Sequence, residues 1–376
     1  MAETRVSYTP TEDQELIRST ARQFLTERFD IETVRDLIMS DEGFDRTHYK
    51  EMADLGWTGL AIAEEHGGAG LGSVEMGVLL EEMGRLLTPG PFFASAVLAT
   101  SVVTEVGTTD DHARILPRLA TGELIATVGL FDTARGWSLH PEHTMVARHG
   151  GKWTLTGTKR AVLDAGMVDL VLVTAAEGDK VVLFAVDPNA SGVTITPESV
   201  LDTTRRQSTV EFDGVVLTEE DRVGQGDTTP GLVRAHRLAT VALAAEQVGG
   251  AQAAMDMAVE YAKSRYQFGR PIGSYQSIKH RCANMLMKVE HARSTAYYGA
   301  RVSQDDDELA VAAPLAGSVC SEAFTWIAGE NIQVHGGIGF TWEHDAHLYL
   351  KRAKASSLLL GSPRYQRDLL GRAIGI

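Results

Sequence analysis

The feature that most constrains this fold is a change of hydrophobic period along its 376 residues. Residues 1–125 place apolar side chains at helical spacing, after a predicted capping box of Thr9, Pro10 and Glu12. Residues 126–228 contain short β-branched stretches such as "KWTLTGTK" and "KVVLFAVD", separated by turn residues. Residues 229–376 are helical again. We predict an α+β fold, mostly α, with an N-terminal helical domain, a middle antiparallel β-barrel or sandwich, and a C-terminal domain of the four-helix-bundle type.

Charge and cysteine content narrow the functional classes. The chain has 35 basic and 50 acidic residues, which argues against a nucleic-acid-binding surface. Cys282 and Cys320 have no metal-binding or redox spacing. The N-terminus lacks the features of a signal peptide, and the apolar run "PFFASAVLATSVV" is shorter than the roughly 20 residues of a membrane span. We expect a soluble, cytoplasmic protein in which this run is a buried helix.

The stretch "SRYQFGRPIGSYQSIKH", residues 264–280, is the strongest local motif. Arg265 ends a long helical pattern, Phe268 and Gly269 indicate a turn, and Gln276 begins the next helix. An arginine and helix ends at one turn can bind a pyrophosphate, because guanidinium pairs with phosphate through two hydrogen bonds. A simple helix–helix turn, with the arginine at the helix C-terminus, explains the same residues equally well.

A second motif, "IQVHGGIGF", combines Gln333 with Gly336 and Gly337. Glycines let a ligand approach the backbone closely, and the glutamine amide both donates and accepts hydrogen bonds. The alternative is a helix C-cap followed by a turn. His344 and His347 nearby lack a third ligand, so we predict no metal site.

Taken together, "RYQFGRPIGSYQ", "IQVHGGIGF" and the helical–β–helical order resemble the acyl-CoA dehydrogenase family of flavoenzymes. The resemblance covers nearly the whole chain: residues 55–85 are similar to the family's N-terminal helical signature, and residues 153–173 to its middle β-domain. It implies an FAD cofactor, an acyl-CoA substrate and transfer of the β-hydride to the flavin while a carboxylate removes the α-proton. It also implies a tetramer and an electron-transfer flavoprotein as acceptor.

The resemblance assigns residues to the cofactor. Arg265, Phe268 and Gln276 are expected on the pyrophosphate and AMP side of FAD. Gln333, Gly336 and Gly337 are expected to reach the same FAD from a neighbouring subunit. Ser362 is assigned to the same cofactor-binding set.

The chain departs from the family where catalysis is expected. The family's base is a glutamate before a Gly-Thr or Gly-Ser pair, and the matching position here is Leu360. Other members place the glutamate on the long helix before the RxxFG turn, where this chain has Ala239. Glu246, two turns further along, is the candidate base within the chain; a helix carboxylate in an ion pair is the alternative.

The flavin-facing segments also differ. The family's "TEPGAGSD" loop is "FDTARGWS" here, residues 131–138, and the Trp-Ile-Thr segment is replaced by Ala161, Val162 and Leu163. Residues 346–367 contain no acid, and their basic residues suit either a phosphate-binding surface or a solvated helix face. The basic residues are Lys351, Arg352, Lys354, Arg364 and Arg367.

These departures leave several functions open. The first is the base-lacking subunit of a heteromeric dehydrogenase acting on fatty or steroid-side-chain thioesters, with a partner chain carrying the glutamate. The second is a self-sufficient homotetramer with a relocated base. Another flavin oxidase or monooxygenase, and a flavin-free structural protein, are weaker alternatives. The acyl chain and the electron acceptor are not determined by the sequence.

Overall fold

A computed structural model describes residues 9–133 and 136–376 of the chain. The chain divides into two compact units, and each is described by itself. Unit 1 consists of Met1–Thr33, Ser73–Thr88 and Thr240–Ile376, and unit 2 of Val34–Gly72 and Pro89–Ala239. The predicted domain boundaries after residues 125 and 228 stay a prediction.

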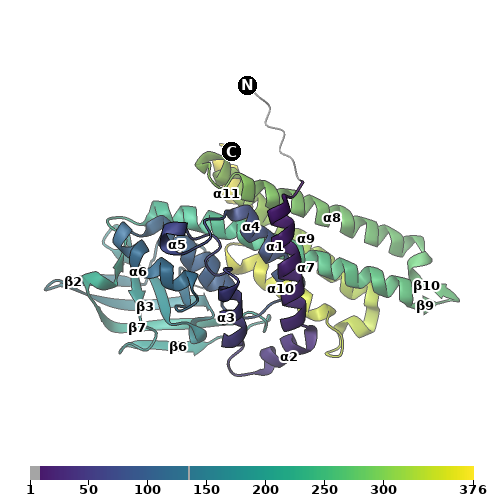
Figure 1. The fold of residues 1–376 in the computed structure, drawn as a ribbon, viewed down its shortest axis with the longest axis horizontal. Coiled ribbons are helices and arrows are strands. Elements are labelled where there is room, and N and C mark those ends of the chain that lie inside the picture. Colours follow the sequence, from purple (N-terminus) through teal and green to yellow (C-terminus); the bar gives the residue numbers. More distant parts are fainter. Residues whose placement is uncertain (1–8, 134–135) are drawn as a thin grey trace. The chain divides into compact units, whose positions relative to one another are not determined.

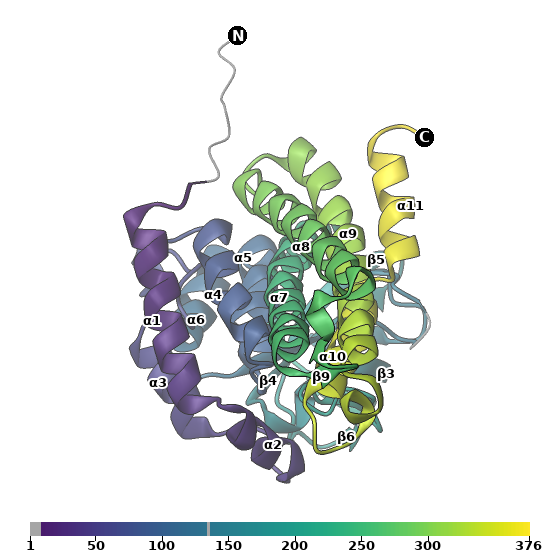
Figure 2. The ribbon, with the colours of Figure 1, turned by 90° about the vertical axis from the view of Figure 1, so that its right-hand side faces the viewer.

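Unit 1 is helical, and its long helices follow the predicted ones. Helix α9 packs against α8, α10 and α11, and Figure 2 shows α8 and α9 side by side. The long helix predicted before the RxxFG turn is α7, which has 36 residues and begins in unit 2. The helices are α1 (Glu12–Arg28), α4 (Ser73–Arg85), α7 (Thr229–Ser264), α8 (Gln276–Arg301), α9 (Asp306–His335), α10 (Ala346–Leu359) and α11 (Pro363–Ala373).

The first helix begins later than predicted. Its N-cap is Thr11, whose hydroxyl accepts a hydrogen bond from Gln14 N at 3.2 Å. The Gln14 side chain in turn accepts from Thr11 N at 3.1 Å, which completes a capping box. The box predicted at Thr9 and Glu12 is therefore wrong by two residues. Glutamine at N3 satisfies the N-cap amide as well as glutamate does. The sequence therefore fits a capping box of Thr9 with Glu12 and one of Thr11 with Gln14 equally well.

Helix α9 belongs to the core of unit 1. Among the described residues, the stretch Asp306–Phe340 is long and apolar enough to cross a membrane by length and composition. Core helices of globular proteins pass the same test, and 61% of its apolar window is buried within the structure. Its contacts with α8, α10 and α11 explain that burial, so we interpret α9 as a core helix.

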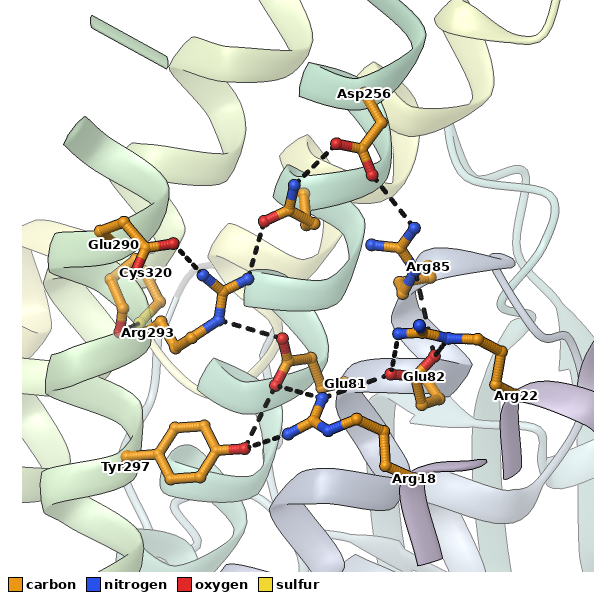
Figure 3. Close-up of polar contacts among 12 residues, drawn as sticks. Arg18, Arg22, Glu81, Glu82, Arg85, Asp256, Glu290, Arg293, Tyr297 and Cys320 are labelled. Atoms are coloured by element: carbon orange, nitrogen blue, oxygen red, sulfur yellow. Dashed lines mark hydrogen bonds and ion pairs between the residues drawn. The ribbon is translucent and has the colours of Figure 1, made fainter. Parts of the chain in front are cut away.

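Two adjacent buried carboxylates attach α1 and α8 to α4 within unit 1 (Figure 3). Glu82 is 2% exposed and accepts hydrogen bonds from Arg22 Nε at 2.9 Å and Arg22 Nη2 at 2.7 Å. Glu81 is 3% exposed and accepts from Arg293 Nε at 3.2 Å, and Arg18 contacts both carboxylates. Burial of these acids is tolerated because each is paired with arginine.

Unit 2 is built on a sheet of eight strands. Trp153 and Phe184 are fully buried in it, with ring centroids 5.6 Å apart. The strands are β1 (Ala126–Gly129), β2 (Met145–His149), β3 (Lys152–Leu163), β4 (Leu170–Glu177), β5 (Lys180–Val186), β6 (Val193–Pro197), β7 (Gln207–Leu217) and β8 (Arg222–Val223), and several are labelled in Figure 1.

The sheet is mixed, whereas the sequence predicted an antiparallel one. Its order is β6-β7-β3-β2-β4-β5-β8, and β1 pairs with β4 outside this path. Most pairs are antiparallel, but β1 and β2 run parallel to β4. The chain forms the β2–β3 hairpin after β1 and before β4. Strand β4 then pairs with β1 in the parallel direction. Alternation of side chains along a strand does not reveal this pairing.

Unit 2 also contains helices, in the segments before its sheet. The predicted buried helix in "PFFASAVLATSVV" is confirmed as a π-helical segment, Phe93–Ala99, followed by α5 (Thr100–Val106). All of Phe93–Ala99 is buried. The other helices are α3 (Arg46–Asp54) and α6 (Thr109–Ala120), while α2 (Ile31–Met39) crosses the division between the units.

Candidate functional site

The predicted turn after α7 is a small β-hairpin in unit 1. Strands β9 (Tyr266–Gln267) and β10 (Arg270–Pro271) pair antiparallel around Phe268 and Gly269. These two residues have φ values of 52° and 78°, and a two-residue turn of type I′ requires positive φ at both central positions. The Phe268 side chain is 93% exposed. The hairpin therefore presents a strained, solvent-facing aromatic residue beside Arg265.

The N-terminus of α8 lies directly after this hairpin. Its N-cap residue, Tyr275, makes no side-chain capping hydrogen bond, and Gln276 is the first helical residue. The leading amides of a helix without a cap are free to bind an anion, and the helix dipole favours negative charge there. The side chains of Arg265 and Gln276 are exposed. This end of α8 has the donors of an anion-binding site.

The end of α9 reaches the same end of the helical unit. The ring centroids of Tyr261 on α7 and His335 on α9 are 4.2 Å apart. An ion pair between Arg281 and Glu330 joins the start of α8 to the end of α9. The structure thus gathers the predicted cofactor residues at one end of the unit. These are Arg265, Phe268, Gln276, Gln333, Gly336 and Gly337.

Two glycines leave open space at the end of α9. Gly336 is the C-cap and has a φ of 64°, as the C-cap alternative predicted. A Cβ atom added to Gly336 or Gly337 would meet no atom within 4 Å. The Gln333 side chain is exposed beside them. Open backbone and an amide suit the close approach of a dinucleotide, so Gln333, Gly336 and Gly337 fit a contact with FAD. That they reach the FAD of a neighbouring subunit stays a prediction.

The position predicted for the family's catalytic glutamate is apolar and buried. Leu360 follows the end of α10, is 2% exposed, and its carbonyl oxygen accepts a hydrogen bond from Gln366 Nε2 at 2.8 Å. Gly361 has a φ of 117°, and Ser362 is the N-cap of α11. The Ser362 hydroxyl accepts from Tyr365 N at 3.2 Å. This contact gives Ser362 a helix-capping role, and the prediction that it binds the cofactor is untested.

Glu246 is held in an ion pair. Its Oε1 accepts a hydrogen bond from Arg352 Nη1 at 2.8 Å, and both side chains are nearly fully buried. A carboxylate paired with a buried guanidinium is stabilised in its charged form and resists taking up a proton. This geometry gives the prediction of Glu246 as a base no support and matches the ion-pair alternative.

Most cations of the acid-free segment have partners within unit 1. Arg352 pairs with Glu246, and Arg367 forms an ion pair with Glu322. The Lys351 ammonium lies 4.1 Å from the centroid of the Trp342 ring, a cation–π contact. Lys354 and Arg364 have exposed side chains. Three of the five cations are thus held by contacts within the unit, which argues against a phosphate-binding surface formed by all five.

In unit 2, the loop expected to face the flavin is anchored by Asp132. Its Oδ2 accepts from the amides of Glu142, His143 and Thr144 at 2.8, 2.7 and 2.9 Å. Lys159 Nζ donates to Asp132 Oδ1 at 2.6 Å. Burial alone would raise the pKa of Asp132, but Lys159 and these amides hold it below its ordinary value. Residues 134–135 of this loop lie outside the described residues.

Lys159 is itself fully buried in the sheet. Burial lowers its pKa from 10.5 to about 8, although the charge of Asp132 opposes the shift. The ammonium also donates to Thr174 Oγ1 at 2.9 Å and to Leu130 O at 3.3 Å. Lys159 fixes the start of the 131–138 loop against the sheet.

The segment that replaces Trp-Ile-Thr offers no hydroxyl. The pairing of β3 with β7 is irregular between Lys159 and Val162, and Ala161 has a φ of 51°. Val162 and Leu163 are 1% and 3% exposed. Their apolar side chains belong to the core of unit 2, so the polar contact expected near the flavin's reactive edge is missing from these residues.

Comparison with known proteins decides the family. Residues 11–123 match the family described as "Acyl-CoA dehydrogenase, N-terminal domain", and residues 237–375 match "Acyl-CoA dehydrogenase, C-terminal domain". The chain is 33% identical over 360 residues to the acyl-CoA dehydrogenase IpdE2 of Mycolicibacterium smegmatis, covering 94% of this chain and 96% of the relative. This protein belongs to the acyl-CoA dehydrogenase family.

Two solved structures share its fold. A variant of the Tcur3481–Tcur3483 steroid ACAD has a TM-score of 0.87 at 29% identity, covering 96% of this chain and 98% of the other. The ChsE4–ChsE5 complex from Mycobacterium tuberculosis has a TM-score of 0.90 at 27% identity, covering 98% of this chain and 99% of the other. The predicted family and fold class are confirmed. As an acyl-CoA dehydrogenase, the protein belongs to the oxidoreductases that act on CH–CH bonds and to a flavoprotein family.

Within this acyl-CoA dehydrogenase, sequence reasoning missed two buried pairs. Arg352 was assigned to a surface, and only its place on the inner face of α10 distinguishes it from Lys351. The pair of Lys159 and Asp132 had no clear signal in the sequence. Lys159 lies between Thr158 and Arg160, and Asp132 comes 27 residues before it.

Proposed function

We propose that this acyl-CoA dehydrogenase family member is the base-lacking subunit of a heteromeric enzyme that dehydrogenates an acyl-CoA thioester at the α,β position. One observation carries the proposal: Leu360, at the position predicted for the family's catalytic glutamate, is buried and 2% exposed. A leucine side chain cannot take a proton. Ala239, at the alternative base position, is 0% exposed and equally inert.

FAD is the proposed cofactor, and this chain would hold its pyrophosphate end. When bound, FAD accepts the hydride in this family's reaction. Arg265 would pair with phosphate oxygens, and the uncapped amides of α8 would neutralise their charge. Across the subunit interface, Gln333 and the open backbone at Gly336 and Gly337 would supply further contacts to the FAD of the neighbouring subunit. Val162 and Leu163, buried in unit 2, would supply no hydroxyl to the flavin.

The partner is proposed to be a second acyl-CoA dehydrogenase chain that supplies the base. Two of the solved relatives are described by paired names, ChsE4–ChsE5 and Tcur3481–Tcur3483, and the second is described as a steroid ACAD. These relatives support a heteromer and a steroid-side-chain or fatty-acyl thioester as substrate. An electron-transfer flavoprotein is the proposed acceptor, by family resemblance.

A self-sufficient homotetramer with Glu246 as base is the second candidate. Its carboxylate would have to leave Arg352 before it could accept a proton, which would leave the buried guanidinium without its counter-charge. That cost favours the heteromeric proposal.

The test uses the chain expressed alone, with its flavin content measured and then titrated anaerobically with fatty-acyl and steroid-side-chain CoA thioesters. We expect either bound oxidised flavin whose absorbance does not bleach, or no retained flavin. Bleaching by any thioester would contradict the proposal and favour the homotetramer. Recovery of bleaching on adding a glutamate-bearing family chain would support the heteromer.

A further inference from the structure

A separate pocket lies in unit 1, between the end of α7 and the start of α8. Its volume is about 470 Å³, within the range of small-molecule sites. Most of its lining is apolar, and the hairpin after α7 closes one side. The lining residues are Val259, Ala262, Lys263, Pro271, Gly273, Ser274, Ile278, Lys279 and Cys282. Arg265 and Gln276, the predicted cofactor residues, are not among them.

The charge of this lining is opposite to that of the chain. The protein has a net charge of −15, yet the lining residues include Lys263 and Lys279 and no carboxylate. Lys263 Nζ donates to Glu260 Oε1 at 2.6 Å, in an exposed pair of the kind that contributes little. In the part of the chain that the structure describes, Lys279 forms no ion pair. An anion entering the pocket would meet a free ammonium group.

Ser274 supplies a polar group on the wall. Its Oγ atom is buried from solvent and has no hydrogen-bond partner among the described residues. A buried hydroxyl without a partner costs free energy, and a ligand oxygen would remove that cost. Apolar walls, one free hydroxyl and a lysine together favour a molecule with an apolar body and one anionic head.

We propose that this pocket binds a small amphipathic carboxylate, with its apolar chain against Val259 and Ile278 and its carboxylate near Ser274 and Lys279. The proposal does not rest on the proposed dehydrogenase role, because none of these residues is used there.

The reactivity of one cysteine can be used to measure ligand binding in this pocket. Cys282 lines the pocket and is half-buried, whereas Cys320 is 1% exposed and its thiol donates to Ala292 O at 3.3 Å. These are the two cysteines of the chain. Iodoacetamide should therefore alkylate Cys282 selectively, and a ligand in the pocket should slow that reaction. Mass spectrometry of the two cysteine peptides measures both rates in one sample.

The experiment compares sodium decanoate, decanol and FAD as protecting agents for the full chain. We expect saturating decanoate to slow alkylation of Cys282 at least fivefold, and decanol to do so only at much higher concentration. Lys279→Gln should weaken decanoate binding about tenfold, the size of one charge-assisted hydrogen bond. Lys354→Gln, an exposed lysine on α10, is the matched control and should change nothing.

Three outcomes would overturn the inference. Equal protection by decanol and decanoate would mean that the lysine does not select the anion. Protection by FAD and not by decanoate would assign the pocket to the cofactor. Absence of any alkylation at Cys282 would mean that the pocket is closed to small molecules. Ile278→Trp, which fills the pocket, should abolish protection by decanoate while leaving the circular dichroism spectrum unchanged.

Discussion

Arg352 Nη1 lies 2.8 Å from Glu246 Oε1, and this buried pair joins α10 to α7 within the helical unit. Arg352 Nη2 also donates to the carbonyl oxygens of Leu87 and Thr88, at 3.2 and 3.4 Å, just beyond α4. Leu87 has a φ of 52° and is fully buried, so the arginine stabilises a strained helix end. One side chain thus connects three helices of the unit.

Glu246→Gln tests whether the pair is structural. The substitution leaves the buried guanidinium of Arg352 without its counter-charge, so we expect it to lower the free energy of unfolding by about 3–5 kcal/mol. Urea denaturation of the purified chain measures the change. The double variant Glu246→Leu with Arg352→Leu removes both charges and should recover much of the loss. A normal unfolding curve for Glu246→Gln, together with lost catalysis in the assembled enzyme, would identify Glu246 as the base instead.

Leu360→Glu tests whether the missing base is the main defect. We expect slow flavin bleaching by acyl-CoA in this variant, about 10²-fold faster than in Leu360→Gln, because a positioned general base contributes a factor of that order. The glutamine of Leu360→Gln has nearly the same shape as the glutamate of Leu360→Glu but cannot take the proton. The measurement is anaerobic stopped-flow absorbance on flavin-loaded protein. Equal rates in the two variants, with flavin still bound, would show that the pocket differs beyond the base.

The sequence predicted the fold well where local signals are strong. Helices α7, α8 and α9 were predicted from their apolar periodicity, and the turn at Phe268 and Gly269 from its glycine. The parallel pairing of β1 with β4 was missed, because strand direction depends on distant contacts that periodicity does not encode. The N-cap was misplaced because Glu12 and Gln14 both suit position N3.

The candidate site was predictable only in part. Arg265, Gln276 and Gly336 were identified by motif, and the structure places them at one end of the helical unit. Arg352 could not be assigned correctly, because a buried and a solvated arginine look alike in a sequence. Its burial depends on a carboxylate 106 residues away on another helix.

Asp132→Asn tests the anchor of the 131–138 loop through the pH dependence of stability. The pKa of Asp132 is lowered below 3.8 in the folded chain, so the unfolded chain binds this proton more readily. Its contribution is therefore complete above pH 3.8 and is lost as the pH falls through the lowered value. We expect the acid side of the stability curve to be shallower in Asp132→Asn than in the parent, measured by urea unfolding from pH 6 to pH 2.5. Asp179→Asn, in an exposed turn of the same sheet, is the control and should keep the parental slope.

Arg265 provides the most direct test of the proposed cofactor contacts. Arg265→Ala removes a guanidinium that can form two hydrogen bonds to phosphate, so we expect FAD affinity to fall about tenfold to hundredfold. Arg265→Lys keeps the charge without the paired geometry and should show an intermediate loss. Titration of the flavin-free chain with FAD, followed by flavin fluorescence, measures all three affinities. Arg301→Ala, at the opposite end of α8, removes an exposed arginine and should bind FAD as the parent does. If Arg265→Ala and Arg301→Ala bind equally well, the pyrophosphate is held elsewhere, and the anion site at the start of α8 needs another ligand.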